Sequence, residues 1–381
     1  MNRELITLTQ KLINIDSSNP PGKEKEVISF IQSYLAELGV PSKIYEFKKE
    51  RPNLICAINS INRRKKIVLT PHIDTVPVTG CWRFGPFSGK VYKGRIYGRG
   101  ATDDKGNAAV ALYLIKILKQ EKILLKNLDL VFAFTADEET GSDYGIKPLL
   151  KKLRGVDYGI VLDSGEFDIV VAQKGLLHIK IEIFGKEAHG AYPERGINAI
   201  EKSVYILKDI LKEKLTPHAH PLLKETTVNI GTIQGGEKVN IVAGYNSFEL
   251  DIRYIPPFKK EMIIKKIRKI IERYKVRYKI QILASQEPLQ IRKTHFLIKE
   301  LKRVLRHYRI TPCCKPSFGA TVINFLKDKG IDTFAFGFGS KGCAHTTNEY
   351  VKIDNLVKGV KILKTYLLQL DALFEKKKKI P

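Results

Sequence analysis

A histidine and an aspartate two residues apart, His72 and Asp74, are the first side chains in the sequence that could do metal chemistry together. They follow a short apolar run, Ile67–Leu69, which is bounded by turn residues and predicts a buried strand. A histidine binds metals through one ring nitrogen, and a nearby carboxylate can accept the N–H of the other nitrogen and fix the tautomer. On its own, however, a His-x-Asp pair is more often a hydrogen-bonded turn than a metal site.

Similar side chains recur after other predicted strands. Three further apolar runs, 128–135, 158–162 and 332–337, each precede a carboxylate or a histidine, and an acidic pair stands among glycines. These residues are Asp103, Asp104, Glu138, Glu139, Asp163 and His345. Because the carboxyl ends of parallel strands share one edge of an open α/β sheet, we expect these side chains to converge there. Carboxylate and imidazole ligands without thiolates suit zinc, manganese or cobalt.

The acidic run Asp137–Glu139 has a simpler interpretation, because most such triplets are solvated surface charges. Two adjacent carboxylates are also useful in amide hydrolysis. One can remain a metal ligand while the other takes a proton from water and delivers it to the leaving nitrogen. The other acidic and histidine segments favour this second interpretation.

The chain resembles the zinc aminoacylase, carboxypeptidase G and succinyl-diaminopimelate desuccinylase/acetylornithine deacetylase family of dinuclear metallohydrolases. The matching segments occur in the order of the family and extend over nearly the whole chain. They are residues 71–77, Trp82 with 86–87, and residues 97–106, 137–141 and 344–350.

The resemblance implies a role for each candidate. His72 and Asp163 would bind one metal, Glu139 and His345 the other, and Asp103 both; the peptide bond from Asp103 to Asp104 would be cis. Two further roles are implied: Asp74 would orient His72, and Glu138 would be the general base. The implied cofactors are two divalent ions, with zinc expected and cobalt or manganese as alternatives.

The implied activity is hydrolysis of the amide bond of a small N-acyl amino acid by a water that bridges the two metals. A dipeptidase or carboxypeptidase is the alternative. The aspartate at position 163 occurs often in peptidase-like members, whereas deacylase-like members often have glutamate. Val322 stands where the family frequently has an aspartate, in a loop that helps to bind the carboxylate of the substrate. The identity of the substrate therefore stays open.

The periodicity of the apolar residues predicts an α/β protein with an inserted domain. Residues 1–174 and 286–381 alternate helices and strands, as in a mostly parallel sheet, and residues 107–119 predict a buried helix. Residues 175–285 follow a β-α-β-β-α-β order, with helices at 197–211 and 260–274, which is typical of a ferredoxin-like α+β domain. The resemblance identifies this insert as the lid and the dimerisation domain of a homodimer.

Four further residues are implied to contact the substrate. His189 would stabilise the oxyanion from the lid, and the alternative is that the His189 acting on a given site belongs to the partner subunit of a dimer. Arg253 offers a guanidinium fork for a carboxylate, and Asn240 and Gly319 would line the same site. Without the resemblance, His189 is read as a turn residue and Arg253 as a surface residue at a strand edge.

The composition narrows the class of protein. The 381 residues carry a net charge of +26, which raises the question of nucleic-acid binding. However, the Lys and Arg residues are dispersed and no nucleic-acid motif is present, so we expect solvated helix faces instead. No apolar run is long enough to span a membrane, and the five cysteines form no CxxC pattern. We expect a cytoplasmic enzyme; a non-catalytic binding protein on the same scaffold is the remote alternative.

Overall fold

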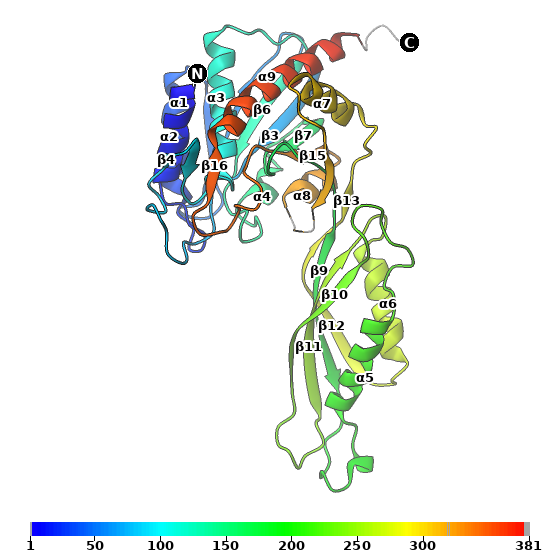
Figure 1. The fold of residues 1–381 in the computed structure, drawn as a ribbon. Helices are drawn as coiled ribbons and strands as arrows, with labels where there is room; N and C mark the ends of the chain where they lie inside the picture. The colour runs from blue at the N-terminus through cyan, green and yellow to red at the C-terminus, as the bar shows by residue number, and fades with distance from the viewer. Residues whose placement is uncertain (1, 318, 320, 377–381) are drawn as a thin grey trace. The chain divides into compact units, whose positions relative to one another are not determined.

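The computed structural model describes residues 2–317, 319 and 321–376, and its chain groups into two compact units (Figure 1). The large unit contains residues 1–171, 291–315 and 321–381. The small unit contains residues 172–290 and 316–320. Each unit is described by itself below.

A nine-stranded mixed sheet organises the large unit. Its strands in spatial order are β1 (Ser42–Glu46), β2 (Pro52–Ile58), β6 (Leu128–Phe134), β3 (Lys65–Thr70), β7 (Tyr158–Val161), β15 (Asp332–Phe336), β8 (Ile169–Gln173) and β13 (Leu289–Gln290), and β14 (Cys314–Ser317) also pairs with β8. The four central strands β6, β3, β7 and β15 are parallel, whereas the flanking pairs are antiparallel. Every residue of β6 is buried, as expected for a strand covered on both faces.

Helices cover this sheet. The bounds of the longer ones are α1 (Asn2–Asn14), α2 (Glu24–Glu37), α3 (Lys105–Gln120), α7 (Phe296–His307) and α9 (Ile353–Lys376), and two short ones are α4 (Ile146–Leu149) and α8 (Ile323–Asp328). Helix α3 packs against α1 and α9, and α7 packs against α9 (Figure 1). The predicted helix 107–119 lies within α3, whose residues from Lys105 to Ile115 are all buried. A small sheet, β16-β5-β4, adds strands at Tyr350–Lys352, Arg95–Tyr97 and Lys90–Tyr92.

The small unit is a four-stranded antiparallel sheet with two helices. Its elements in chain order are β9 (Gly175–Phe184), the 3₁₀ turn η1 (Pro193–Arg195), α5 (Ala199–Lys212), β10 (Thr227–Gly235), β11 (Tyr245–Tyr254), α6 (Lys260–Glu272) and β12 (Arg277–Gln286). The sheet order β10-β11-β9-β12 is the ferredoxin-like arrangement. Alternate residues of β9, from Leu177 to Ile183, are fully buried and pack with apolar residues of α5 and α6. This unit therefore has its own hydrophobic core.

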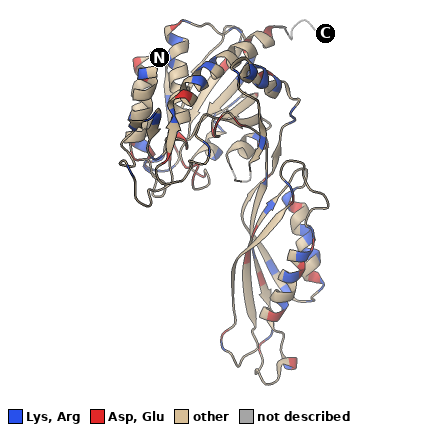
Figure 2. Ribbon diagram, in the orientation of Figure 1, with Lys and Arg blue, Asp and Glu red and all other residues tan. Residues whose placement is uncertain are grey.

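The structure confirms the predicted mixed α/β class with a largely parallel central sheet. The observed sheet differs from a fully parallel one at both edges, where β1, β2, β8 and β13 run antiparallel to their neighbours. Among the described residues, no helix combines the length and the apolar character that crossing a membrane requires. Lys and Arg residues are spread over the helices of both units with acidic residues between them (Figure 2).

Candidate metal centre

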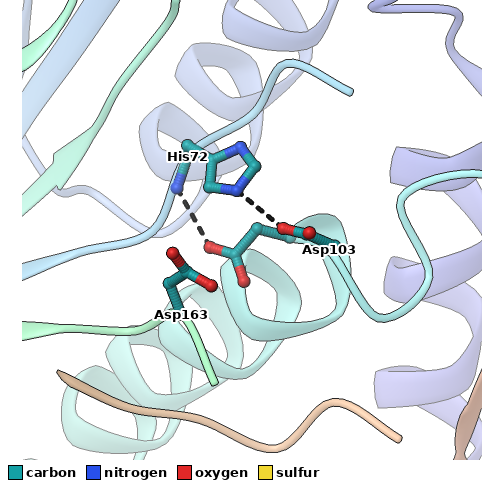
Figure 3. Close-up of side chains that lie close together, drawn as sticks. His72, Asp103 and Asp163 are labelled. Atoms are coloured by element: carbon teal, nitrogen blue, oxygen red, sulfur yellow. Dashed lines mark hydrogen bonds and ion pairs between the residues drawn. The ribbon is translucent and has the colours of Figure 1, made fainter. Parts of the chain in front are cut away.

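Three neighbouring parallel strands, β6, β3 and β7, direct most of the candidate residues to one edge of the large sheet. His72 comes two residues after β3, Glu138 and Glu139 follow β6, and Asp163 follows β7. In an open parallel sheet, this carboxyl edge is where ligands bind. Asp103 belongs to the turn before α3, and the side chains of His72, Asp103 and Asp163 lie together in Figure 3.

The first group of possible ligand atoms comes from His72, Asp103, Asp104 and Asp163, and these atoms all lie within 4.8 Å of one another. The His72 side chain is almost fully buried, and its Nε2 lies 2.9 Å from Oδ1 of Asp103. Its other nitrogen, Nδ1, donates to the main-chain carbonyl of Asp74 at 3.0 Å. That contact fixes the tautomer in which Nε2 is free for a metal.

The second group joins Asp103 to Glu139 and His345, again within 4.8 Å. The His345 Nε2 lies 3.1 Å from Oδ2 of Asp103 and 3.1 Å from Oε1 of Glu139. His345 is half exposed, and its backbone has a φ of +60°, a conformation that non-glycine residues rarely adopt. Asp103 therefore belongs to both groups, with one carboxylate oxygen toward each histidine.

A buried ion pair holds the turn that carries Asp103. The Glu349 carboxylate accepts the backbone N–H groups of Thr102 and Asp103 at 2.8 and 3.0 Å, and Arg99 donates to its other oxygen at 2.8 Å. Both charged side chains are 1 % exposed or less. The Asp103–Asp104 peptide bond is cis, which confirms that prediction. Sequence reasoning gave no role to Arg99 or Glu349, although both lie within or beside the matching segments.

Asp104 was not among the predicted ligands, and its carboxylate is used within the protein. It accepts the backbone N–H of His72 at 3.0 Å and a hydrogen bond from the Asn107 side chain. It is fully buried, and burial raises the pKa of Asp104 well above its ordinary value. These contacts fit a residue that supports the His72 loop better than a metal ligand.

Asp74 is fully buried and contacts more than His72. Its two carboxylate oxygens accept the backbone N–H groups of Glu138 and Glu139, each at 3.1 Å, and the Asn19 amide donates at 2.9 Å. The carboxylate lies 3.5 Å from the His72 ring, farther than the main-chain carbonyl of Asp74. Asp74 therefore links the loop of His72 to the loop of the two glutamates.

The electrostatics of the group are those of clustered, buried carboxylates. Burial, reinforced by the charge of Asp103, raises the pKa of Asp163 to about 7. Hydrogen bonds to Asp103 and Glu139 raise the pKa of His345 to about 10. Burial alone would lower the pKa of His72, but hydrogen bonds to Asp103 and Asp74 raise it well above its ordinary value. So many carboxylates in one place favour bound positive charge.

Glu138 stands beside both groups without belonging to either. Burial is the main cause that raises the pKa of Glu138 well above its ordinary value, and the charges of Asp163 and Glu139 add to it. A carboxyl group with a raised pKa is suited to taking up and releasing a proton near neutral pH.

The donor set fits two divalent cations. The residues predicted as ligands supply two imidazole nitrogens and three carboxylates, with Asp103 shared, and no thiolate. This is the borderline-to-hard set that zinc, cobalt and manganese accept. The five residues come from five separate loops or turns, and all of these belong to the large unit.

The four candidates in the small unit fall into three places. The loops of His189 and Asn240 adjoin, since Gly190 donates its N–H to the Asn240 carbonyl at 2.8 Å and His189 forms a β-bridge with Ile241. Asn240 lies shortly before the first residue of β11, Tyr245, whereas Arg253 lies near the last residue of that strand. The Arg253 Nε donates to Asp251 at 2.7 Å. Gly319 is exposed and accepts a hydrogen bond from Ser317, while its neighbours Phe318 and Ala320 lie outside the described residues.

The model of peptidase family M20/M25/M40 matches residues 68–369 of the chain. This chain belongs to that family. An uncharacterised metallohydrolase of Methanocaldococcus jannaschii is 32% identical over 93% of this chain and 96% of its own length. An acetylornithine deacetylase of Myxococcus xanthus is 29% identical over 87% of this chain and 88% of its own. A succinyl-diaminopimelate desuccinylase of Wolbachia pipientis is 26% identical over 96% of this chain and 93% of its own length.

Solved structures of the M20 family share the fold. The aminopeptidase PepT of Bacillus cereus superposes with a TM-score of 0.79 at 23% identity, covering 97% of this chain and 98% of its own. An M20 metallo-carboxypeptidase of Sulfolobus solfataricus gives 0.75 at 21% identity, covering 97% and 99%. At these identities the likeness concerns the fold. The M20 membership makes the chain a metallohydrolase, in agreement with the geometry of its carboxylate and histidine groups.

Proposed function

We propose that this M20 metallohydrolase cleaves the amide bond of a small N-acyl amino acid with a free carboxylate. One observation carries the proposal: two groups of ligand atoms share the Asp103 carboxylate, and Glu138, which belongs to neither group, is close enough to His72, Asp163 and Glu139 to interact with their charges. In this proposal His72 and Asp163 bind one ion, Glu139 and His345 bind the other, and Asp103 binds both. Zinc is the proposed metal, with cobalt and manganese as alternatives.

The remaining residues of the large unit prepare the reaction. Two bound cations would lower the pKa of a water molecule between them and polarise the amide carbonyl. Glu138 would accept a proton from the attacking water and deliver it to the leaving nitrogen, a role for which its raised pKa is suited. Asp74 aims Glu138 by accepting its backbone N–H at 3.1 Å, and through its main-chain carbonyl it also fixes the ring of His72.

Two considerations bear on the substrate. The relatives named for acetylornithine and succinyl-diaminopimelate act on acylated amino acids that carry a free carboxylate, which favours a deacylase. The aspartate at position 163, which the resemblance associates with peptidase-like members, favours the alternative, a dipeptidase or carboxypeptidase. Both substrate classes present a carboxylate, and Arg253, Asn240 and Gly319 are the proposed groups that bind it.

The lid is proposed to be residues 175–285, in a homodimer. Arg253 and Tyr245 lie at opposite ends of β11, roughly 27 Å apart at about 3.4 Å per residue, and the loops of His189 and Asn240 adjoin the Tyr245 end. A small substrate cannot span that distance within one copy of the lid. This supports a dimer in which His189 and Arg253 acting on one substrate come from different subunits. A cytoplasmic location is also proposed, since all five cysteines are free thiols.

The test is amine release from N-succinyl-diaminopimelate, N-acetylornithine, N-acetyl-lysine and a few dipeptides, with protein preloaded with zinc or cobalt. We expect metal-dependent turnover that disappears in Glu138→Gln. Acylated amino acids as the best substrates support the deacylase, and dipeptides as the best substrates replace it with the alternative. A fully metallated protein without turnover on any of them contradicts the proposed substrate class.

A further inference from the structure

The segment after α1, residues 17–19, runs beside the loop that carries His72 and Asp74. Thr75 donates its N–H to the Ser17 carbonyl at 3.1 Å, and Asn19 donates its N–H to the Thr75 carbonyl at 2.8 Å. The Ser17 hydroxyl donates to the Ile73 carbonyl at 2.6 Å. The loop therefore has a main-chain partner far away in sequence, which holds its position.

The side chain of Asn19 reaches further than this pairing. Its Nδ2 donates to Oδ2 of Asp74 at 2.9 Å and to Oγ1 of Thr140 at 2.9 Å, and it lies 3.4 Å from Oδ1 of Asp137. Asn19 is 2 % exposed, and Asp74 and Asp137 are equally buried. One amide group thus joins the loop of His72 to the turn that carries Glu138 and Glu139.

The chemical type of this residue matters because of what surrounds it. The Asp74 carboxylate already accepts the backbone N–H groups of Glu138 and Glu139, one on each oxygen. The Arg51 guanidinium pairs with Oδ1 of Asp137 at 3.0 Å, the same oxygen that the Asn19 amide faces at 3.4 Å. Between these two buried carboxylates, a neutral group that donates hydrogen bonds keeps both in place, whereas an acceptor would repel both.

We propose that Asn19 is a positioning residue for the catalytic glutamates: it fixes the orientation of Asp74, and Asp74 fixes the backbone of Glu138 and Glu139. This inference deepens the proposed function and rests on it. Among the described residues, the Asn19 side chain donates hydrogen bonds to Asp74, Asp137 and Thr140, and none to a proposed metal ligand or to Glu138. Its loss therefore changes the placement of the general base and of one ligand, not the number of ligands.

The decisive variant is Asn19→Asp, which keeps the shape of the side chain but replaces its N–H donors by oxygen. Removing such supporting contacts typically lowers activity by about 10- to 100-fold. We expect a decrease of this size in kcat on the best substrate, a KM changed by less than about threefold, and two metals still bound per chain. The visible spectrum of the cobalt-loaded variant should shift, because Glu139 moves.

Asn127→Asp is the matched control. Asn127 is also fully buried, donates its Nδ2 to the main-chain carbonyl of Asp371 at 3.2 Å, and precedes β6 at the end opposite to Glu138. The control should lose stability but keep its kcat and its cobalt spectrum. If Asn19→Asp does not fold, Asn19→Ser, which introduces no charge, should show the same losses to a smaller degree.

Two results would overturn the inference. One is a folded Asn19 variant whose kcat and cobalt spectrum equal those of the natural protein. The other is an equal loss of kcat in Asn127→Asp at equal stability. If the natural protein hydrolyses none of the substrates, the proposed function fails, while the cobalt spectra of the Asn19 and Asn127 variants still decide whether Asn19 positions this site.

Discussion

The candidate residues of the two units are supported in different ways. In the large unit, Asp74, Asp103 and His72 are buried or nearly so, and each is held by hydrogen bonds from more than one segment. In the small unit, His189 and Asn240 are exposed on adjoining loops, and Arg253 has one carboxylate partner two residues away on its own strand.

This difference separates two kinds of functional group. The groups of the large unit have their geometry fixed before any ligand arrives, as a metal centre requires. The groups of the small unit have few contacts of their own, so their effect depends on what they meet when substrate is bound. We expect substitutions of these residues in the large unit to abolish activity. Each substitution in the small unit should instead lower activity by a limited factor.

The largest effect is expected for Asp103→Ala, because both groups of ligand atoms lose their shared member. We expect metal content to fall below two ions per chain and activity to fall below detection. Metal analysis and turnover of the purified variant measure this. Asp157→Ala is the control, because Asp157 precedes β7 at the end opposite to Asp163 and pairs with Lys65. This variant should keep its metal content and its activity. Unchanged metal content in Asp103→Ala excludes a bridging role.

Glu138→Gln should lower kcat by about 100- to 10,000-fold, the usual range for a general base, while both metals stay bound. The physical reason is that the amide of glutamine cannot accept the proton of the attacking water. Metal analysis and steady-state kinetics on the same sample separate the two effects. Near-native kcat would show that another group is the base.

His189→Ala should lower kcat by about 100- to 1,000-fold if the ring stabilises the oxyanion, with little change in KM and none in metal content. His218→Ala is the matched control, because His218 is also an exposed histidine of the small unit and lies in the loop between α5 and β10. Equal losses in both variants would assign the effect to the fold of the lid and remove His189 from the reaction.

Arg253→Ala should raise KM by about 10- to 100-fold with little change in kcat, since a hydrogen bond to a charged group contributes about 1.5–3 kcal/mol. The effect should vanish for a substrate whose carboxylate is amidated. Lys180→Ala removes one positive charge from the same face of the sheet, opposite Glu249, and serves as control. An unchanged KM in Arg253→Ala contradicts the carboxylate-binding role.

The last prediction concerns the pH dependence of metal binding. In the metal-free protein the pKa of His345 is raised to about 10, so this residue stays protonated near neutral pH, whereas the pKa of Asp163 is raised to about 7, so this residue is about half protonated at pH 7. A metal must displace these protons, and its apparent affinity should therefore rise with pH, by about tenfold per pH unit for each proton released. Titration of the metal-free protein with zinc between pH 6.5 and 8 measures this. An affinity independent of pH would mean that these ligands are already deprotonated.

Much of the large unit could be predicted from the sequence because its signals are local. Apolar runs that are followed by His72, Glu138 or Asp163 indicate where each strand lies. They also indicate that these three side chains lie at the carboxyl ends of their strands. The alternating pattern of β9, with every second residue buried, likewise predicts the half-covered sheet of the small unit. In each case burial on one face or on both faces dictates the residue pattern.

What the sequence could not supply are contacts between distant segments. Nothing in the run Asn19-Pro20-Pro21-Gly22 beyond a turn indicates that Asn19 donates to Asp74. The pairing of Arg99 with Glu349 joins residues 250 positions apart, and no periodicity encodes such a contact. Similarly, the direction of a strand relative to its neighbour, such as the antiparallel pairing of β8 with β15, depends on the path of the connecting segments. Apolar patterns do not specify that path.

The position of β15 has a consequence for how the chain is made. This strand, residues 332–336, lies between β7 and β8, which end about 170 and about 160 residues before it in the sequence. Until the ribosome has delivered it, β7 has an unpaired edge next to apolar residues, and such edges are templates for aggregation. The four strands and two helices of the small unit are complete by residue 286 and can fold within that interval. The nascent large unit must therefore keep a gap in its sheet open until its last strand arrives.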